Sequence, residues 1–180
     1  MENDDILRVA TYNIHKGVQG LGPARRLEIH NLGLAVEQLD ADIVCLQEVR
    51  KLHRREAAYF QRWPDVPQAE YLAPEGYEAV YRTNAFTKHG EHGNALLTRW
   101  PVIGHQHEDI SDHRFEQRGL LHVEVGAHGR QVHVIVVRLG LIPGSRIRQI
   151  GQLQRFIERE VPKGAPLVVA GDFNDWGLQI

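Results

Sequence analysis

Short apolar runs along the first third of the chain predict an alternation of strand and helix. Residues 7–14 read as a strand that leads into a glycine-rich loop, and apolar residues at positions 29, 32, 36 and 39 then recur at helical spacing. Residues 43–46 form a continuous apolar run, as in a strand that is buried on both faces. This part of the chain therefore predicts strand, loop, helix and strand.

From residue 77 onward the pattern changes to short strands at close intervals, several of them separated by Gly or Pro. We expect five such strands, at residues 77–81, 94–98, 102–107, 119–125 and 131–137. Their succession indicates a meandering, mostly antiparallel sheet, and residues 167–170 predict one last strand that ends at Gly171.

A second helix is predicted after Ser145, which can serve as its N-cap. Apolar residues with helical spacing place one face of this helix in the core: Ile147, Ile150, Leu153, Phe156 and Ile157. Residues 62–74 hold three prolines and few apolar residues, so we expect a surface loop there. Because strands and helices do not alternate regularly, the sequence predicts a mixed α/β protein in layers, forming a single domain over residues 1–180.

Composition narrows the class of protein. A hydrophobic share of 42% and a charged share of 24% are ordinary for a globular domain, and no stretch is long enough to span a membrane. The acidic N-terminus does not resemble a secretory signal, and the single cysteine, Cys45, lies in an apolar run as a core residue. We therefore expect a cytoplasmic protein, and its net charge of -2 argues against a surface coated with basic residues for nonspecific duplex binding.

Polar residues with ligand chemistry follow three of the predicted strands. Asn13 ends the first strand, Glu48 ends the second, and Asp172 and Asn174 follow the last. Each one alone could simply form a turn. Strand ends meet at one rim of a sheet, however, and carboxylate and amide oxygens together suit a hard cation such as Mg²⁺.

Four segments, three of which contain these residues, resemble the successive motifs of the endonuclease/exonuclease/phosphatase superfamily of metal-dependent phosphoesterases. They are Thr11–Gly17, Asp42–Glu48, Gly93–Arg99 and Gly171–Asp175. The resemblance spans about residues 7 to 176. It implies a two-layer mixed β-sandwich flanked by helices, as in deoxyribonucleases, with hydrolysis of phosphoester bonds that depends on Mg²⁺ or Mn²⁺.

The resemblance also implies a role for each motif residue. Glu48 would ligate the metal, and Asn13 beside it would contact metal-bound water or the scissile phosphate. Asp172 would orient or deprotonate the attacking water, and Asn174 would donate a hydrogen bond to a phosphate oxygen.

Two features depart from the family pattern. Family members carry a His in the strand where this chain has Arg138, and an Arg can bind phosphate but cannot shuttle a proton at neutral pH. Arg138 either compensates as a charge clamp or marks an altered site. In addition, the family has a further Asp and a Ser-Asp-His element after the last motif, whereas this chain ends at Ile180. We therefore expect a domain that is C-terminally incomplete relative to the family, with an open sheet edge through which it self-associates or loses stability.

Other polar groups favour ordinary explanations. Ser111-Asp112-His113 has the letters of the missing element but lies in mid-chain, as a polar loop. The pairs His89 with His92 and His105 with His107 lack the partners of a zinc site. Arginines on the second predicted helix suit a solvated face paired with glutamates: Arg146, Arg148, Arg155 and Arg159.

The sequence thus predicts a metal-dependent phosphoesterase. Its substrate is a phosphoester, with nucleic acid among the candidates. Two alternatives remain open: a noncatalytic phosphate-binding or interaction module on a degraded phosphoesterase scaffold, and an inactive fragment of a working enzyme.

Overall fold

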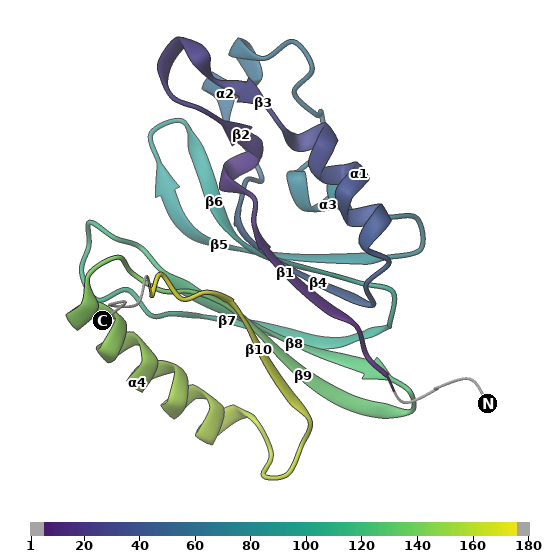
Figure 1. The fold of residues 1–180 in the computed structure, drawn as a ribbon. Helices are drawn as coiled ribbons and strands as arrows, with labels where there is room; N and C mark the ends of the chain where they lie inside the picture. The colour runs from purple at the N-terminus through teal and green to yellow at the C-terminus, as the bar shows by residue number, and fades with distance from the viewer. Residues whose placement is uncertain (1–5, 176–180) are drawn as a thin grey trace, which may run out of the picture.

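The computed structural model describes residues 6–175 and shows two four-stranded sheets packed face to face, with helices on both outer surfaces (Figure 1). The first sheet has the strand order β1-β4-β6-β5 and the second β10-β9-β8-β7. The strands of the first sheet are β1 (Val9–Asn13), β4 (Ile43–Val49), β5 (Glu78–Thr87) and β6 (Gly90–Thr98). Those of the second are β7 (Val102–Asp109), β8 (Gly119–Ala127), β9 (Arg130–Arg138) and β10 (Leu167–Asp172).

The predicted mixed β-sandwich flanked by helices is confirmed. Strands β1 and β4 run parallel, as do β9 and β10, whereas the other neighbours in the two sheets are antiparallel. The two short strands β2 (Val18–Gln19) and β3 (Arg26–Leu27) pair separately in the loop after β1. This loop also holds two 3₁₀ turns, η1 (His15–Gly17) and η2 (Gly22–Ala24).

The core lies in three layers, because each sheet is covered on both faces. Between the sheets pack alternate residues of their strands, including Cys45, Leu96, Val123 and Val134. The helices α1 (Ile29–Leu39) and α3 (Gln68–Leu72) cover the outer face of the first sheet, and α4 (Pro143–Glu160) covers that of the second. Burial raises the pKa of the Cys45 thiol to about 12, so this cysteine is an inert core residue, as predicted.

The region after β4 contains helices that the sequence pattern did not predict. The helix α2 (Arg54–Tyr59) lies in a charged stretch, and the nitrogen Nδ1 of His53 caps it by accepting the Glu56 N–H at 3.2 Å. The helix α3 lies within the segment expected to be a loop. Both helices are only five or six residues long, too short for a periodic apolar pattern, so burial against the sheet and capping contacts decide them.

The face that α4 buries also differs from the prediction. Ile147 and Ile150 are 71% and 49% exposed, whereas the buried positions are Ser145, Gln149, Leu153 and Phe156. The helix begins at Pro143, so Ser145 lies in its first turn and is not the N-cap. Ser145 donates to Asp112 at 2.6 Å and Gln149 accepts from the Gly140 N–H at 2.7 Å, and these hydrogen bonds turn a polar stripe inward.

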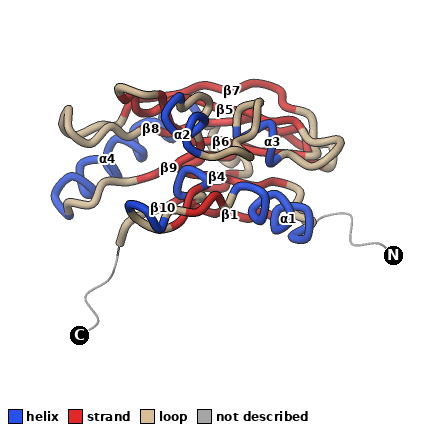
Figure 2. The backbone as a smooth tube through the Cα atoms, turned by 90° about the horizontal axis from the view of Figure 1, so that it is seen from above, coloured by secondary structure: helices blue, strands red, loops and turns tan. Residues whose placement is uncertain are grey.

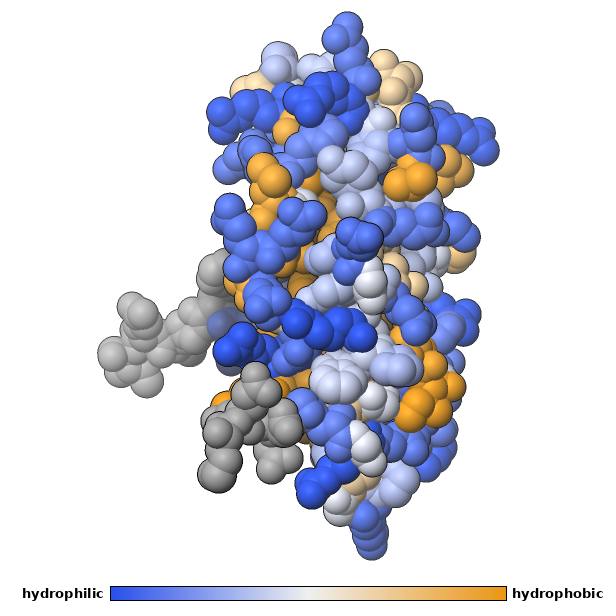
Figure 3. Space-filling view, turned by 90° about the vertical axis from the view of Figure 1, so that its right-hand side faces the viewer, coloured by the Kyte–Doolittle hydropathy of each residue, from blue (hydrophilic) through white to orange (hydrophobic). Residues whose placement is uncertain are grey.

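One side of the sandwich carries one edge strand of each sheet, β1 and β10. Within residues 6–175, β1 pairs only with β4 and β10 only with β9, and β1 and β10 lie side by side where the two sheets meet (Figures 1 and 2). An apolar hollow of about 400 Å³ lies beside this edge between α1 and β1, lined by Tyr12, Leu32 and Leu39 among others. On the face drawn in Figure 3, apolar side chains form separate patches on a largely hydrophilic surface. Self-association through the open edge stays a prediction.

Candidate active site

Four strands bring the predicted site residues to one rim of the sandwich. Asn13 ends β1, Glu48 lies near the end of β4, Arg138 ends β9 and Asp172 ends β10. Arg138 and Asp172 are register partners in the parallel pair β9–β10. We call these four residues and Asn174 the rim cluster.

The amide of Asn13 joins the two carboxylates of the rim cluster. Its Nδ2 donates to Glu48 Oε1 at 2.9 Å and to Asp172 Oδ2 at 2.9 Å, although Asn13 and Asp172 are 159 positions apart. Its Oδ1 accepts the His15 N–H at 2.9 Å. In this arrangement Asn13 fixes the spacing of the carboxylates, and a role toward a metal stays a prediction.

Asn174 is held by the backbone behind the site. Its Nδ2 donates to the Leu139 carbonyl at 2.7 Å, and its own N–H donates to Asp172 Oδ1 at 3.0 Å. Gly171 allows β10 to approach β9 this closely, since a Cβ there would lie 1.8 Å from the Val137 carbonyl oxygen. The Gly-Asp-Phe-Asn motif therefore places Asp172 and Asn174 together with the end of β9.

Cations surround Glu48, whose residue is only 7% exposed. Arg138 Nη2 lies 2.8 Å from Oε1, and Lys16 Nζ lies 3.4 Å from Oε2. Burial alone would raise the pKa of Glu48, but Arg138, the Asn13 hydrogen bond and Lys16 outweigh it and lower the pKa. The Glu48 carboxylate is therefore ionised at neutral pH.

Backbone strain is concentrated around the site. Six residues other than glycine have positive φ between residues 6 and 175, and four of them lie here: His15, Lys16, Glu48 and Asn174. At Glu48 (φ 55°) the register between β4 and β6 shifts, which is a bulge that turns the side chain toward the rim. Such conformations cost free energy and gather at functional sites.

A pocket of about 450 Å³ opens beside the rim cluster. Its lining includes Lys16, His92 and Arg138, together with Arg114. Phe86 and Phe115, which are 71% and 82% exposed, lie at its edge. Burial, reinforced by Lys16, lowers the pKa of His92 to about 4, so this imidazole is neutral at physiological pH. Neither His92 nor the two phenylalanines was predicted as a site residue, because only the folded chain brings them to the rim.

The donor set of the rim cluster fits a hard divalent cation, since Glu48 and Asp172 present carboxylate oxygens about one shared amide. The charges around this donor set are less favourable for a cation, because the guanidinium of Arg138 already contacts the Glu48 oxygen that accepts from Asn13.

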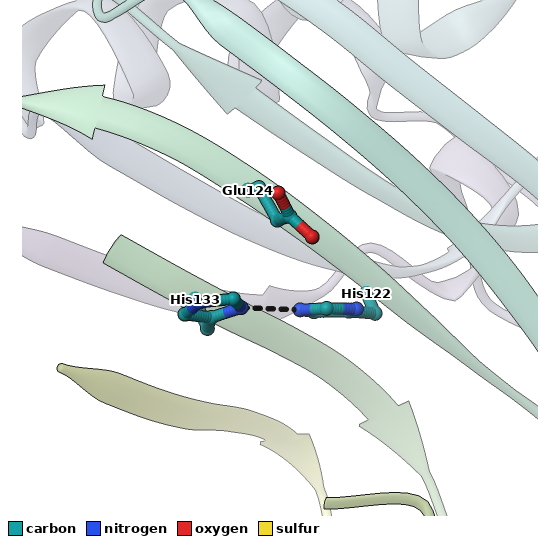
Figure 4. Close-up of side chains that lie close together, drawn as sticks. All are labelled: His122, Glu124 and His133. Carbon is teal, nitrogen blue, oxygen red and sulfur yellow. Dashed lines mark hydrogen bonds between the residues drawn. The ribbon is translucent and has the colours of Figure 1, made fainter. Parts of the chain in front are cut away.

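A second polar cluster lies on the outer face of the second sheet, under α4. His122 and His133 stack with ring centroids 5.2 Å apart, and His122 Nε2 and His133 Nδ1 share a hydrogen bond of 2.9 Å (Figure 4). We call these two residues the histidine pair. Potential ligand atoms of the pair and of Glu124 all lie within 4.8 Å of one another.

The geometry of the histidine pair is that of a structural hydrogen bond. Two nitrogens on one tetrahedral zinc lie roughly 3.3 Å apart, given Zn–N bonds of about 2.0 Å, and the 2.9 Å here is shorter. Gln106 Nε2 lies 3.1 Å from His122 Nδ1, and Phe156 packs edge-on against the His122 ring. The sequence did not single out this pair, although both histidines interrupt apolar strands.

Apart from His92, which lines the pocket beside the rim cluster, several of the polar groups noted in the sequence form contacts of their own. Ser111-Asp112-His113 is in the loop between β7 and β8, where Asp112 forms a two-point ion pair with Arg148 at 2.6 Å, as expected for a structural loop. His107 lies 3.1 Å from Asn84 Oδ1, and Arg159 pairs with Glu160 at 2.7 Å on the exposed face of α4.

Comparisons with known proteins agree with the geometry. YbhP of Escherichia coli (strain K12), an uncharacterized protein, is 39% identical over 172 residues, which cover 94% of this chain and 67% of that protein. Among solved structures, the mannosyl-6-phosphatase of Bacteroides thetaiotaomicron superposes with a TM-score of 0.67 at 18% identity, over 94% of this chain and 66% of that one. D. rerio TDP2 complexed with single strand DNA product superposes with a TM-score of 0.59 at 18% identity, over 93% of this chain and 60% of that one.

These structural likenesses show a shared fold, and the chain spans only about two thirds of the length of these proteins. Residues 10–178 match the sequence model of the Endonuclease/Exonuclease/phosphatase family. The chain therefore belongs to the Endonuclease/Exonuclease/phosphatase family.

Proposed function

We propose that the whole protein hydrolyses phosphoester bonds at the rim cluster with the help of Mg²⁺ or Mn²⁺. The observation that carries the proposal is the Asn13 amide, which bridges Glu48 and Asp172 at 2.9 Å each and so holds two carboxylates from distant segments about one point. Family membership supports the reaction class, since hydrolysis is the general activity of this family.

Each residue of the rim cluster has a proposed task. Glu48 holds the metal, which when bound neutralises charge that develops on the phosphate. Asp172 accepts a proton from the attacking water or orients it, with its own orientation set by Asn13 and by the Asn174 N–H. Asn174 uses one amide N–H on Leu139 and keeps the other for a phosphate oxygen, and Arg138 clamps the phosphate as a fixed cation.

The pocket beside the rim cluster supports an anionic substrate that carries a planar group. Lys16, Arg114 and Arg138 supply positive charge, and the exposed rings of Phe86 and Phe115 can stack on a base. D. rerio TDP2, which has the same fold, was solved with a single strand DNA product. We propose single-stranded nucleic acid or a nucleotide as the first substrate to test.

The test is a metal-dependent activity screen of the full-length protein against a generic aryl phosphodiester, single-stranded DNA, duplex DNA, RNA and a lipid phosphodiester. We expect turnover with Mg²⁺ or Mn²⁺ and none with EDTA. Equal turnover in EDTA would contradict the proposed role of the metal. The absence of turnover on every substrate would contradict the proposal that the protein is an enzyme.

A noncatalytic phosphate-binding module is the second candidate function. The ion pair between Arg138 and Glu48 at 2.8 Å favours it, because this pair neutralises the carboxylate without a metal. Binding of inorganic phosphate by calorimetry in EDTA, without metal-stimulated turnover in the screen, would support this module over the enzyme.

A further inference from the structure

Arg138 holds the position that a divalent cation would need at Glu48. Its Nη2 is 2.8 Å from Glu48 Oε1, which also accepts from Asn13, while Lys16 faces the other carboxylate oxygen at 3.4 Å. Both oxygens of Glu48 are therefore engaged, and both charged neighbours repel a metal. A cation that binds Glu48 through Oε1 must displace the guanidinium from this oxygen.

The guanidinium of Arg138 is only half satisfied where it lies. Its Nε is buried, has no hydrogen-bond partner within residues 6–175, and is 3.9 Å from Asp172 Oδ2. Buried N–H groups without partners are rare in folded proteins, and an unsatisfied one at a functional site calls for a ligand. The Nε and Nη2 groups of one arginine match two oxygens of a phosphate, and the pocket that Arg138 lines lies next to them.

We propose that Arg138 and the metal compete for Glu48. A substrate phosphate ends this competition, because the guanidinium leaves Glu48 and binds the phosphate oxygens instead. Metal and phosphate then bind cooperatively. Arg138 is a positioning residue for the metal as well as a phosphate ligand. The inference rests on the proposed function, because it places the metal at Glu48.

The competition can be measured directly as a change in Mg²⁺ affinity, in an experiment that needs no turnover. Calorimetric titration of the metal-free protein with Mg²⁺, in the absence of phosphate, should give weak binding. Arg138→Gln removes the charge and leaves a shorter polar side chain, so it should tighten Mg²⁺ binding by about 10-fold, within the usual range of coupling between sites. Arg114→Gln removes a charge from the same pocket without touching Glu48, and we expect it to change Mg²⁺ affinity by less than about 2-fold.

Inorganic phosphate supplies the second half of the test. In the unmodified protein, phosphate should tighten Mg²⁺ binding, and Mg²⁺ should tighten phosphate binding by the same factor, because linkage is reciprocal. Arg138→Gln should lose this coupling. Arg138→Lys keeps the positive charge but loses the planar pair of N–H donors that can bind two phosphate oxygens. It should therefore keep the weak Mg²⁺ binding and lose much of the coupling. Circular dichroism and melting temperature check that each variant is folded.

The outcomes separate this inference from the proposed function. If Glu48→Gln leaves Mg²⁺ affinity unchanged, the metal is not at Glu48 and both ideas fail. If Glu48→Gln abolishes Mg²⁺ binding but folded Arg138→Gln and Arg138→Lys bind Mg²⁺ and phosphate with the same affinities and coupling as the unmodified protein, only the competition is refuted.

Discussion

The rim cluster and the histidine pair are both groups of potential metal ligands, but their polar atoms are satisfied in different ways. In the histidine pair, the facing nitrogens bond to each other at 2.9 Å and His122 bonds further to Gln106. In the rim cluster, carboxylates face cations, the backbone is strained, and the Arg138 Nε has no hydrogen-bond partner among the residues that the structure describes. A polar network that satisfies itself stabilises the fold, whereas one that stays strained and incomplete is prepared for a ligand.

The largest effect should follow from removing a carboxylate of the rim cluster. In the full-length protein, Asp172→Ala should remove at least ~3 kcal/mol of transition-state stabilisation, as calculated from the fall in kcat/KM. This loss is comparable to that of a preorganised catalytic group. Steady-state kinetics with a generic phosphodiester measure this loss. Asp65→Ala is the control. It removes an exposed carboxylate that is distant in sequence from Asp172, and it should leave kcat/KM unchanged. Full activity of Asp172→Ala would remove Asp172 from the reaction.

The histidine pair should affect stability and not catalysis. His133→Ala leaves His122 without its buried partner, so it should lower the free energy of unfolding by about 1–3 kcal/mol. Urea unfolding measures the change. His128→Asn is the control, because His128 is exposed and asparagine tolerates its φ of 50°. A loss of activity in folded His133→Ala as large as that of Asp172→Ala would erase the difference between the two clusters.

Acid should weaken the fold near the rim cluster in two successive pH ranges. Folded His92 has a pKa of about 4, so the unfolded chain binds a proton first and stability falls as the pH drops from about 6.5 to about 4. The lowered pKa of Glu48 adds a further loss below its ordinary value of 4.5. At His92 this shift corresponds to at most ~3 kcal/mol, which solvent screening reduces.

Urea midpoints measured across pH separate the two groups. His92→Gln should flatten the upper part of the decline and Glu48→Gln the lower part. The flattening by His92→Gln will be partial, because burial also lowers the pKa of His53, His107 and His122. If both variants keep the pH profile of the unmodified protein, the pKa values of His92 and Glu48 do not account for the loss of stability in acid.

The smallest effect is expected at Glu124. Figure 4 shows its carboxylate close to the histidine pair without a hydrogen bond to either imidazole, and within residues 6–175 it accepts a hydrogen bond from Gln131 instead. Glu124→Gln should change the free energy of unfolding by less than about 0.5 kcal/mol, as for ordinary surface substitutions. Zn²⁺ should leave the melting temperature unchanged in both proteins. A rise with Zn²⁺ in the unmodified protein alone would make the histidine pair and Glu124 a metal site.

Sequence patterns predicted the elements whose burial is periodic and missed those held by single contacts. The run at residues 43–46 is a strand buried at every position from Ile43 to Val49, as its continuous apolar pattern indicated. The helix α2 depends on the His53 cap, and α4 turns Gln149 inward because Gly140 donates to it. A periodic pattern averages over many residues and cannot register one hydrogen bond from a distant segment.

The sequence by itself indicated the family and the sandwich, and it named Asn13, Glu48, Asp172 and Asn174 as candidate site residues, because motif letters and strand ends are local properties of the chain. The tertiary structure alone decided how these residues meet: the Asn13 bridge, the bulge at Glu48 that turns its side chain toward the rim, and the ion pair between Arg138 and Glu48. It also decided that His92, Phe86 and Phe115 border the same pocket. The physical reason is that charge pairing and burial depend on distances between strands, and these distances are set only when the two sheets pack.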